Sequence, residues 1–269
     1  MRLNFGGATL PALVLLLLAG TLLLGLSLLE TRRRRLAVGG RPVRALEGLR
    51  SALRRAAEAG ETVHISPGAG TLIPGGRAAE TLAGLEVAGG VAEEAFSLGI
   101  PVVASTNDAL VHIATSRLLE SAREKAGAPV ELEARCLWLS QQDRMAYAVG
   151  TLEVLSWPEV QSSVLVGSFD TEMLLLLDAG SRETRFQLPG AASAAGVPFL
   201  PIAGREYLLG EEIYVAGACL QPRPGRLAGV ATQDFIRLVV MFLIVAGVLL
   251  VSLRGPVELP RSLFWMPFP

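Results

Sequence analysis

The sequence predicts an α/β protein in which a doubly wound, mostly parallel sheet is flanked by N- and C-terminal transmembrane helices. Two observations predict this class. Short apolar runs rich in β-branched residues alternate, along the middle of the chain, with segments of helical periodicity. A long uncharged apolar segment also lies near each end of the 269-residue chain.

The composition narrows the class of protein further. Hydrophobic residues make up 51% of the chain and charged residues 18%, and the formal net charge is −1. These values exclude a disordered chain and provide no field that attracts nucleic acid, so we expect no nucleic-acid partner. Cys136 and Cys219 lie in no CxxC or Cys/His spacing, and we therefore expect neither a disulfide framework nor a metal bound by cysteine. No cofactor is expected.

The first predicted element is an N-terminal transmembrane anchor within residues 1–30. Residues 8–29 carry no charged side chain, and a helix of this length spans about 33 Å, enough for a hydrocarbon core of about 30 Å. A cleaved signal peptide is the alternative, but its apolar region is usually shorter and ends at a small-residue cleavage site. Residues 31–43 follow as a basic juxtamembrane hinge.

The distribution of arginine predicts the orientation of the chain. Arg32, Arg33, Arg34 and Arg35 directly follow the first apolar segment. The positive-inside rule then places the middle of the chain in the cytoplasm and both termini outside the inner (plasma) membrane. A binding patch for nucleic acid or anionic lipid is the alternative reading of this run, and the lipid bilayer is an expected partner.

The middle segment, residues 44–221, is predicted to be one cytoplasmic α/β domain. Its expected strands are 62–66, 100–105, 134–140, 163–167, 184–188 and 197–203. Its expected helices are 44–59, 77–98, 108–126, 142–157, 171–179 and 206–220. Several strands are apolar without alternation, which is typical of strands covered on both faces, and right-handed crossovers between them require a parallel sheet.

The last predicted elements are a linker at 222–234, a C-terminal transmembrane helix at 235–253 and a short external tail at 254–269. The helix is apolar all round, whereas a core helix of a globular domain normally has a polar face. Arg237 lies close to its start, where a long side chain can reach the membrane interface.

Several segments resemble a known family. They are SPG after the first expected strand, GIPVV, QQDRMAYAVGTLEVL, VLVGSFDTEMLLLLDAG, and YLLGEEIYVAGACL followed by TQD. Together they are similar to an uncharacterised bacterial domain-of-unknown-function family, whose members carry an α/β domain between two membrane helices. The resemblance covers roughly residues 44–250 and implies this architecture without implying an activity.

Small and polar residues recur where the expected strands end, and parallel sheets bind ligands at this carboxyl edge. The ligand-site candidates are Ser66, Gly68, Gly70, Asn107, Asp108, Asp143, Ser168, Asp170 and Glu206. The same residue types also serve as helix N-caps and tight turns, which is the competing interpretation.

Specific catalytic and nucleotide-binding motifs are incomplete. The glycine-rich stretch 66–76 lacks the Lys-Ser/Thr of a P-loop, and Ile73 interrupts its G-x-G-x-x-G pattern. His64 and His112 have no partner at metal-ligand spacing and are interpreted as structural. Four of the candidate carboxylates would bind a divalent cation only if the strand order brought them together, so no metal site or catalytic residue is assigned.

The leading hypothesis is a non-catalytic, membrane-tethered α/β module for self-association or partner recruitment, with a homo-oligomer or another membrane protein as its partner. The alternative is a membrane-bound enzyme, or a sensor of a nucleotide or metabolite that uses a pocket at the carboxyl edge of the sheet.

Overall fold

The computed structural model describes residues 44–73, 77–141, 143–221, 236 and 238–247. Residues 44–221 belong to one compact unit and the remaining described residues to a second. The first unit holds the sheet and every candidate site residue.

The first unit is an α/β fold built on a six-stranded sheet, and every strand pair in it is parallel. The strands are β1 (Thr62–Gly68), β2 (Val102–Thr106), β3 (Ala134–Trp138), β4 (Val160–Ser168), β5 (Phe186–Ala191) and β6 (Leu208–Leu209). Their order across the sheet is β3-β2-β1-β4-β5-β6. The chain therefore builds outward from β1 in one direction and outward from β4 in the other, and the point of reversal lies between these two central strands.

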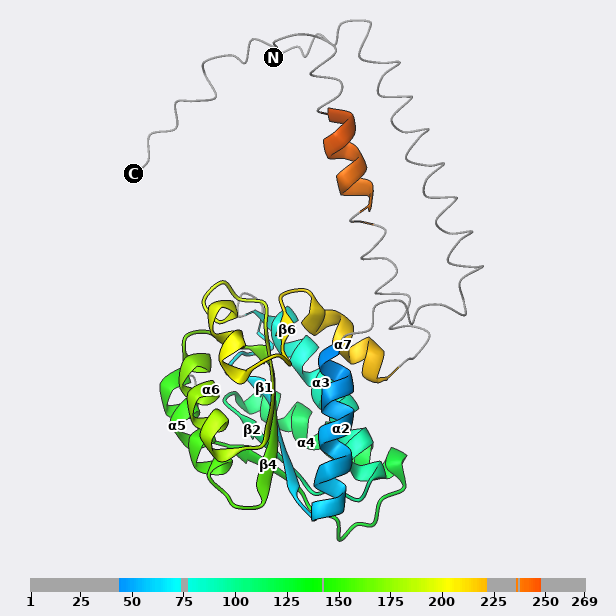
Figure 1. Ribbon diagram of the computed structural model, residues 1–269, viewed down its shortest axis with the longest axis vertical. Coiled ribbons are helices and arrows are strands. Elements are labelled where there is room, and N and C mark those ends of the chain that lie inside the picture. The colour runs from blue at the N-terminus through cyan, green and yellow to red at the C-terminus, as the bar shows by residue number, and fades with distance from the viewer. Residues whose placement is uncertain (1–43, 74–76, 142, 222–235, 237, 248–269) are drawn as a thin grey trace, which may run out of the picture. The chain divides into compact units, whose positions relative to one another are not determined.

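Helices cover both faces of the sheet. They are α2 (Arg44–Ala59), α3 (Ala78–Ser97), α4 (Ala109–Ala126), α5 (Arg144–Leu155), α6 (Glu172–Glu183) and α7 (Glu212–Leu220), with the 3₁₀ helix η1 (Val197–Ala203). Figure 1 shows α5 and α6 on one side of the sheet and α2, α3 and α4 on the other. The predicted α/β class and parallel sheet are thus confirmed.

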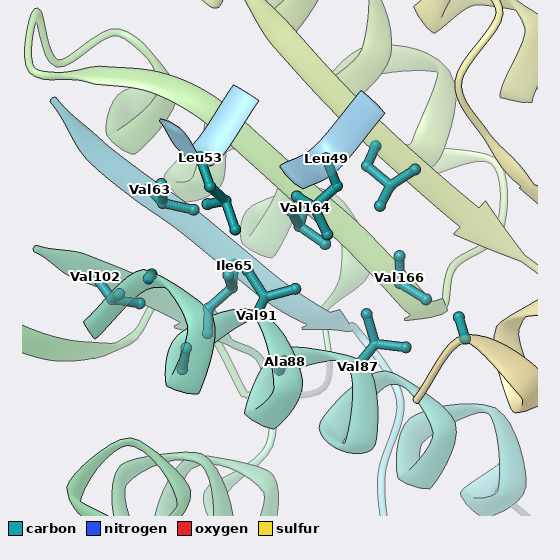
Figure 2. Packing of buried hydrophobic residues seen from close by; sticks show 14 of the residues in the cluster. Leu49, Leu53, Val63, Ile65, Val87, Ala88, Val91, Val102, Val164 and Val166 are labelled. Atoms are coloured by element: carbon teal, nitrogen blue, oxygen red, sulfur yellow. The ribbon is translucent and has the colours of Figure 1, made fainter. Parts of the chain in front are cut away.

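The face of the sheet that contacts α2, α3 and α4 is apolar. Ile65 of β1 and Val164 and Val166 of β4 point to this face, where they meet Leu49 of α2 and Val91 of α3 in one buried cluster (Figure 2). Alternate residues of a strand point to opposite faces, so Val63 and Ile65 of β1 and Val164 and Val166 of β4 enter this core together. Burying each such side chain contributes about 1.5–3 kcal/mol to folding.

The opposite face carries a second apolar cluster and a polar centre. Leu165 of β4 packs there with Phe169 and with Leu176 of α6, all fully buried. His64 of β1 and Ser163 of β4 also point to this face and are fully buried. The sheet is therefore asymmetric, with polar side chains concentrated beneath α5.

One predicted strand is wrong. Residues 197–203 form η1. The two prolines of this short segment, Pro198 and Pro201, remove two N–H groups that a strand could donate and so weigh against a strand. The sixth strand is instead the two-residue β6, which falls inside the helix predicted at 206–220. Gly210, with φ +56°, turns the chain after β6, and α7 begins at Glu212.

The predicted localisation is also corrected. Within the described ranges, the structure contains no helix that is both long and apolar enough to cross a membrane, which contradicts an inner-membrane protein with two spans. The predicted anchor at 1–30, the run Arg32 to Arg35, and the hinge, linker and tail lie outside the described residues. Of the second predicted span, residues 236 and 238–247 are described, and they are helical.

Candidate functional site

The candidate site lies at the carboxyl ends of β1 and β4, where the strand order reverses. Doubly wound sheets bind ligands outside the strand ends at this point. The end of β1 and the loop that follows it pack closely against the end of β4. There is no room for a Cβ at Gly68 or Gly70, because it would collide with atoms of Ser168. Gly68 also has φ +91°, a backbone conformation that residues with a Cβ rarely adopt.

The backbone amides of this loop are turned inward. Gly68 N–H donates to Ser66 Oγ at 3.0 Å, and Ala69 N–H donates to the carbonyl oxygen of Ser168 at 3.0 Å. A phosphate-binding loop presents such N–H groups to its ligand instead. The geometry therefore agrees with the incomplete motif and disfavours a phosphate cradle in the described part of the loop.

Beside the loop, four elements contribute to a charged cluster. Arg77, at the start of α3, pairs with Asp170, which follows β4. Arg144 Nη1, at the start of α5, lies 2.7 Å from Glu172 Oε1 and 3.5 Å from Asp170 Oδ2. Asp170 N–H also donates to Glu172 Oε1 at 3.0 Å. We call Arg77, Glu80, Arg144, Asp170 and Glu172 the switch-point cluster.

The environment shifts two carboxyl groups of the switch-point cluster in opposite directions. Partial burial raises the pKa of Asp170, but the hydrogen bond from Arg77, the nearby Ser193 hydroxyl and the charges of both arginines outweigh burial and hold it below its usual value. Burial raises the pKa of Glu80, and the nearby charge of Arg77 only partly opposes this effect. The surroundings of Glu80 thus disfavour its ionised form.

The backbone of Arg77 is in a strained conformation. Its φ of 55° and ψ of 38° lie in the left-handed region, and it caps α3 without a side-chain hydrogen bond. This conformation costs a residue with a Cβ about 1–2 kcal/mol. The ion pair with Asp170 is the contact that holds the side chain in place, and residues in such conformations often cluster at functional sites.

Several buried polar atoms around the loop have no hydrogen-bond partner among the described residues. They are Glu80 Oε2, Asn107 Oδ1, Ser168 Oγ and Glu172 Oε2. The residues Asn107, Ser168 and Glu172 are only 2%, 0% and 1% exposed. The Ser168 hydroxyl lies close enough to Glu80 to lower its pKa, yet the two form no hydrogen bond of ordinary geometry. Unpaired buried polar groups are rare in folded proteins and point to a missing water, ion or ligand.

A chain of buried hydrogen bonds supports the loop from below. His64 Nδ1 lies 3.0 Å from Ser163 Oγ, and its Nε2 lies 2.9 Å from Ser105 Oγ. The Tyr147 hydroxyl then lies 3.3 Å from Ser105 Oγ and also contacts Ser66 Oγ. Burial lowers the pKa of His64 to about 3 and raises the pKa of Tyr147. Both groups are therefore neutral near pH 7. The hydrogen-bond network thus positions the hydroxyl of Ser66 and contains no charged side chain.

The structure brings some of the predicted site residues together and separates others. Ser66, Gly68, Gly70, Asn107, Ser168 and Asp170 all lie at the ends of β1, β2 and β4. Asp108 and Asp143 instead cap α4 and α5, because each accepts two backbone N–H groups of the following helix. Glu206 lies against Gly48 of α2.

A shared divalent-metal site for these carboxylates is not found. Among the described residues, no group of three or more His, Cys, Asp or Glu side chains is placed to hold a metal ion. Two of the four candidate carboxylates are used locally as helix caps, as the competing cap-and-turn interpretation predicts.

Sequence reasoning missed Arg77, Glu80 and Arg144 as members of the site. Each lies in the first turn of a helix or just before it, at the carboxyl edge where the strands also end. An acidic or basic residue there usually serves helix capping or the helix dipole. The only sequence signal was their position directly after the loops that follow β1 and β3.

The fold and site define a class of protein: an α/β domain with the Rossmann-like strand order 3-2-1-4-5-6 and a polar cluster at its switch point. The chain belongs to the family described as Domain of unknown function (DUF6754), which matches residues 4–260. No curated protein and no solved structure matches the chain.

Proposed function

We propose that the α/β domain is a non-catalytic module that binds a small ligand at its switch point. The observation that carries this proposal is the set of unpaired polar atoms on Asn107, Ser168 and Glu172, each at least nine-tenths buried. An unsatisfied buried group costs about 1–3 kcal/mol, and a ligand that supplied the missing hydrogen bonds would recover this free energy. The unpaired atoms lie where folds of this strand order hold their ligands.

Binding fits the cluster better than catalysis does. Arg77 and Arg144 are held in ion pairs with Asp170 and Glu172. A general acid or base must be free to exchange a proton with a substrate, whereas these groups stabilise one another. The neutral, buried His64 is likewise held between two serine hydroxyls.

Two serines of β4 provide a matched test. Both are fully buried, but Ser163 Oγ bonds to His64 whereas Ser168 Oγ has no partner among the described residues. The full-length protein is screened against a metabolite panel by thermal unfolding, since a ligand that binds only the folded state raises its stability. The Ser168→Ala variant should keep its ligand-free stability and lose most of the ligand-induced rise in melting temperature.

The Ser163→Ala variant should behave in the opposite way. It leaves a ring nitrogen of His64 unpaired, so the free energy of unfolding should fall by about 1–3 kcal/mol, while the ligand-induced rise persists. A panel in which no compound stabilises the wild-type protein contradicts the proposal. Equal loss of the ligand effect in both variants contradicts the assignment of Ser168.

A second candidate function, self-association, has its own supporting observation. Met145 and Val149 of α5 and Leu174 and Leu175 of α6 are exposed by 51%, 61%, 44% and 38%, and these two helices contact each other. An exposed apolar surface of this kind is typical of a protein interface. A second copy of the chain would bury the same surface of both partners, as a two-fold dimer requires.

Sedimentation analysis of the full-length protein tests this candidate. The Val149→Asp variant should shift the protein toward a monomer, because the buried carboxylate would lack a partner. The Ile113→Asp variant is the control, since Ile113 is as exposed, at 60%, but lies on α4. Self-association that survives Val149→Asp, or that both variants weaken equally, rules out this surface.

A further inference from the structure

The unpaired atoms around the β1 loop share one chemical property. Carboxylate and amide oxygens only accept hydrogen bonds, and Glu80 Oε2, Glu172 Oε2 and Asn107 Oδ1 are all of this kind. The amide nitrogen of Asn107 is already used, because it donates to the carbonyl oxygen of Ala69 at 3.2 Å. The site is therefore rich in free acceptors, and a ligand that satisfies them must bring N–H or O–H donors.

The charges of the switch-point cluster do not balance. Two arginines face three carboxyl groups, and both arginines are already in contact with Asp170 or Glu172. Glu80 makes no ion pair among the residues that the structure describes, although it lies near enough to Arg77 for that charge to lower its pKa. Within the described part of the chain, the carboxylate of Glu80 is thus left without an ion-pair partner, and it is partly buried, where a missing counter-charge costs more than in water.

The same features disfavour an anion. The N–H groups of Gly68 and Ala69, which a phosphate would need as donors, are hydrogen-bonded within the protein. A phosphate would also lie beside Glu80, Asp170 and Glu172, and like charges at such short range repel strongly when water is partly excluded. A neutral polyol would satisfy the acceptors but would leave the charge of Glu80 uncompensated.

We infer that the group entering this site is the protonated primary amine of a small organic cation. This inference rests on the proposed ligand-binding function and names the chemical class of the ligand. An ammonium group carries three donors and one positive charge, which match the free acceptors and the excess negative charge. Its hydrogen bonds to carboxylates are charge-assisted and therefore stronger than those between neutral groups.

Calorimetric titration of the full-length protein with three probes tests the inference. The probes are putrescine, 1,4-butanediol, which has the same carbon chain with hydroxyls in place of amines, and inorganic phosphate. Putrescine should bind, the diol should bind at least about tenfold more weakly because it lacks the charge, and phosphate should not bind. This comparison uses only the wild-type protein, so it stands even if a variant fails to fold.

A pair of variants then locates the binding. The Glu80→Gln variant keeps the shape of the side chain and removes its charge, and it should weaken putrescine binding about tenfold. The Glu120→Gln variant is the control, because Glu120 is a surface residue of α4 paired with Arg117, and it should bind putrescine as the wild type does.

The outcomes separate this inference from the proposed function. Binding of phosphate without binding of putrescine overturns the amine assignment while supporting a ligand site. Equal affinity for the diol and putrescine, or unchanged putrescine binding in Glu80→Gln, overturns the role of charge. If all three probes fail but the metabolite panel yields a ligand, the inference alone is wrong; if the panel also fails, both are wrong.

Discussion

The buried histidine makes a quantitative prediction about acid stability. His64 is fully buried, both of its ring nitrogens face serine hydroxyls, and burial lowers its pKa to about 3. In the unfolded chain the imidazole regains its ordinary pKa of 6.5. Between pH 6.5 and pH 3 the imidazole is therefore protonated in the unfolded state but not in the folded state. The free energy of unfolding consequently falls as the pH drops from 6.5 toward 3.

The size of this effect follows from the two pKa values. Each pH unit below 6.5 costs about 1.4 kcal/mol, so moving from pH 7 to pH 5 should lower the free energy of unfolding by about 2 kcal/mol. The low pKa of Asp170 acts only in more acidic solution. The raised pKa of Glu80 acts in the opposite direction, because protonation of this group favours the folded state. A difference between variants isolates the contribution of the histidine.

Urea unfolding of the full-length protein at pH 7 and pH 5, followed by far-ultraviolet circular dichroism, measures the effect. The wild type should lose about 2 kcal/mol more than the His64→Gln variant between the two values. The His112→Gln variant, which keeps His64, should retain that loss. Nuclear magnetic resonance titration of the histidine rings provides a direct check in the wild type. A ring signal of His64 that titrates near pH 6.5 in the folded protein would refute the reasoning.

Two further predictions concern the packing of the sheet. Leu165→Ala should lower the free energy of unfolding by about 2–5 kcal/mol, because Leu165 is fully buried in the central strand β4. A change below about 0.5 kcal/mol in urea unfolding would be inconsistent with that position. Gly84→Ala should destabilise the protein by about 1–3 kcal/mol, because a Cβ there would collide with the carbonyl oxygen of Val166. Gly89→Ala is the control in the same helix, since its Cβ would meet only the side chain of Leu118 at 3.2 Å. Comparable losses of stability in the two glycine variants would argue against the close packing of α3 on the strands.

Local patterns predicted much of the architecture. The apolar runs around Val102 and Val164 are short and not alternating, as expected of strands covered on both faces, and both lie in interior strands of a parallel sheet. The run at 197–203 looks similar in hydrophobicity alone but contains Pro198 and Pro201, and it forms a 3₁₀ helix. Two prolines within seven residues weigh against a strand, although single prolines lie in β1 (Pro67) and β5 (Pro189), so proline content separates the cases only by degree.

For the predicted site, too, local patterns placed residues without defining their contacts. Asp108 and Asp143 were expected at the carboxyl edge, and they lie there, but each bonds to the helix that it begins. A residue just before a helix can serve as a cap using contacts within three positions of itself. This local role competes with any role in a ligand site, and sequence spacing alone does not distinguish the two.

The sequence by itself determined the α/β class, the parallel direction of the strands and the polar character of the strand ends, because these depend on side-chain periodicity and on residues close together in the chain. The tertiary structure alone decided which polar groups meet. Arg77 and Asp170 are separated by 93 positions, and they come together only because β1 pairs with β4. The burial that leaves Asn107, Ser168 and Glu172 with unpaired atoms likewise arises from that strand order. Contacts between distant segments are set by how whole layers pack, and no local pattern in the chain encodes them separately.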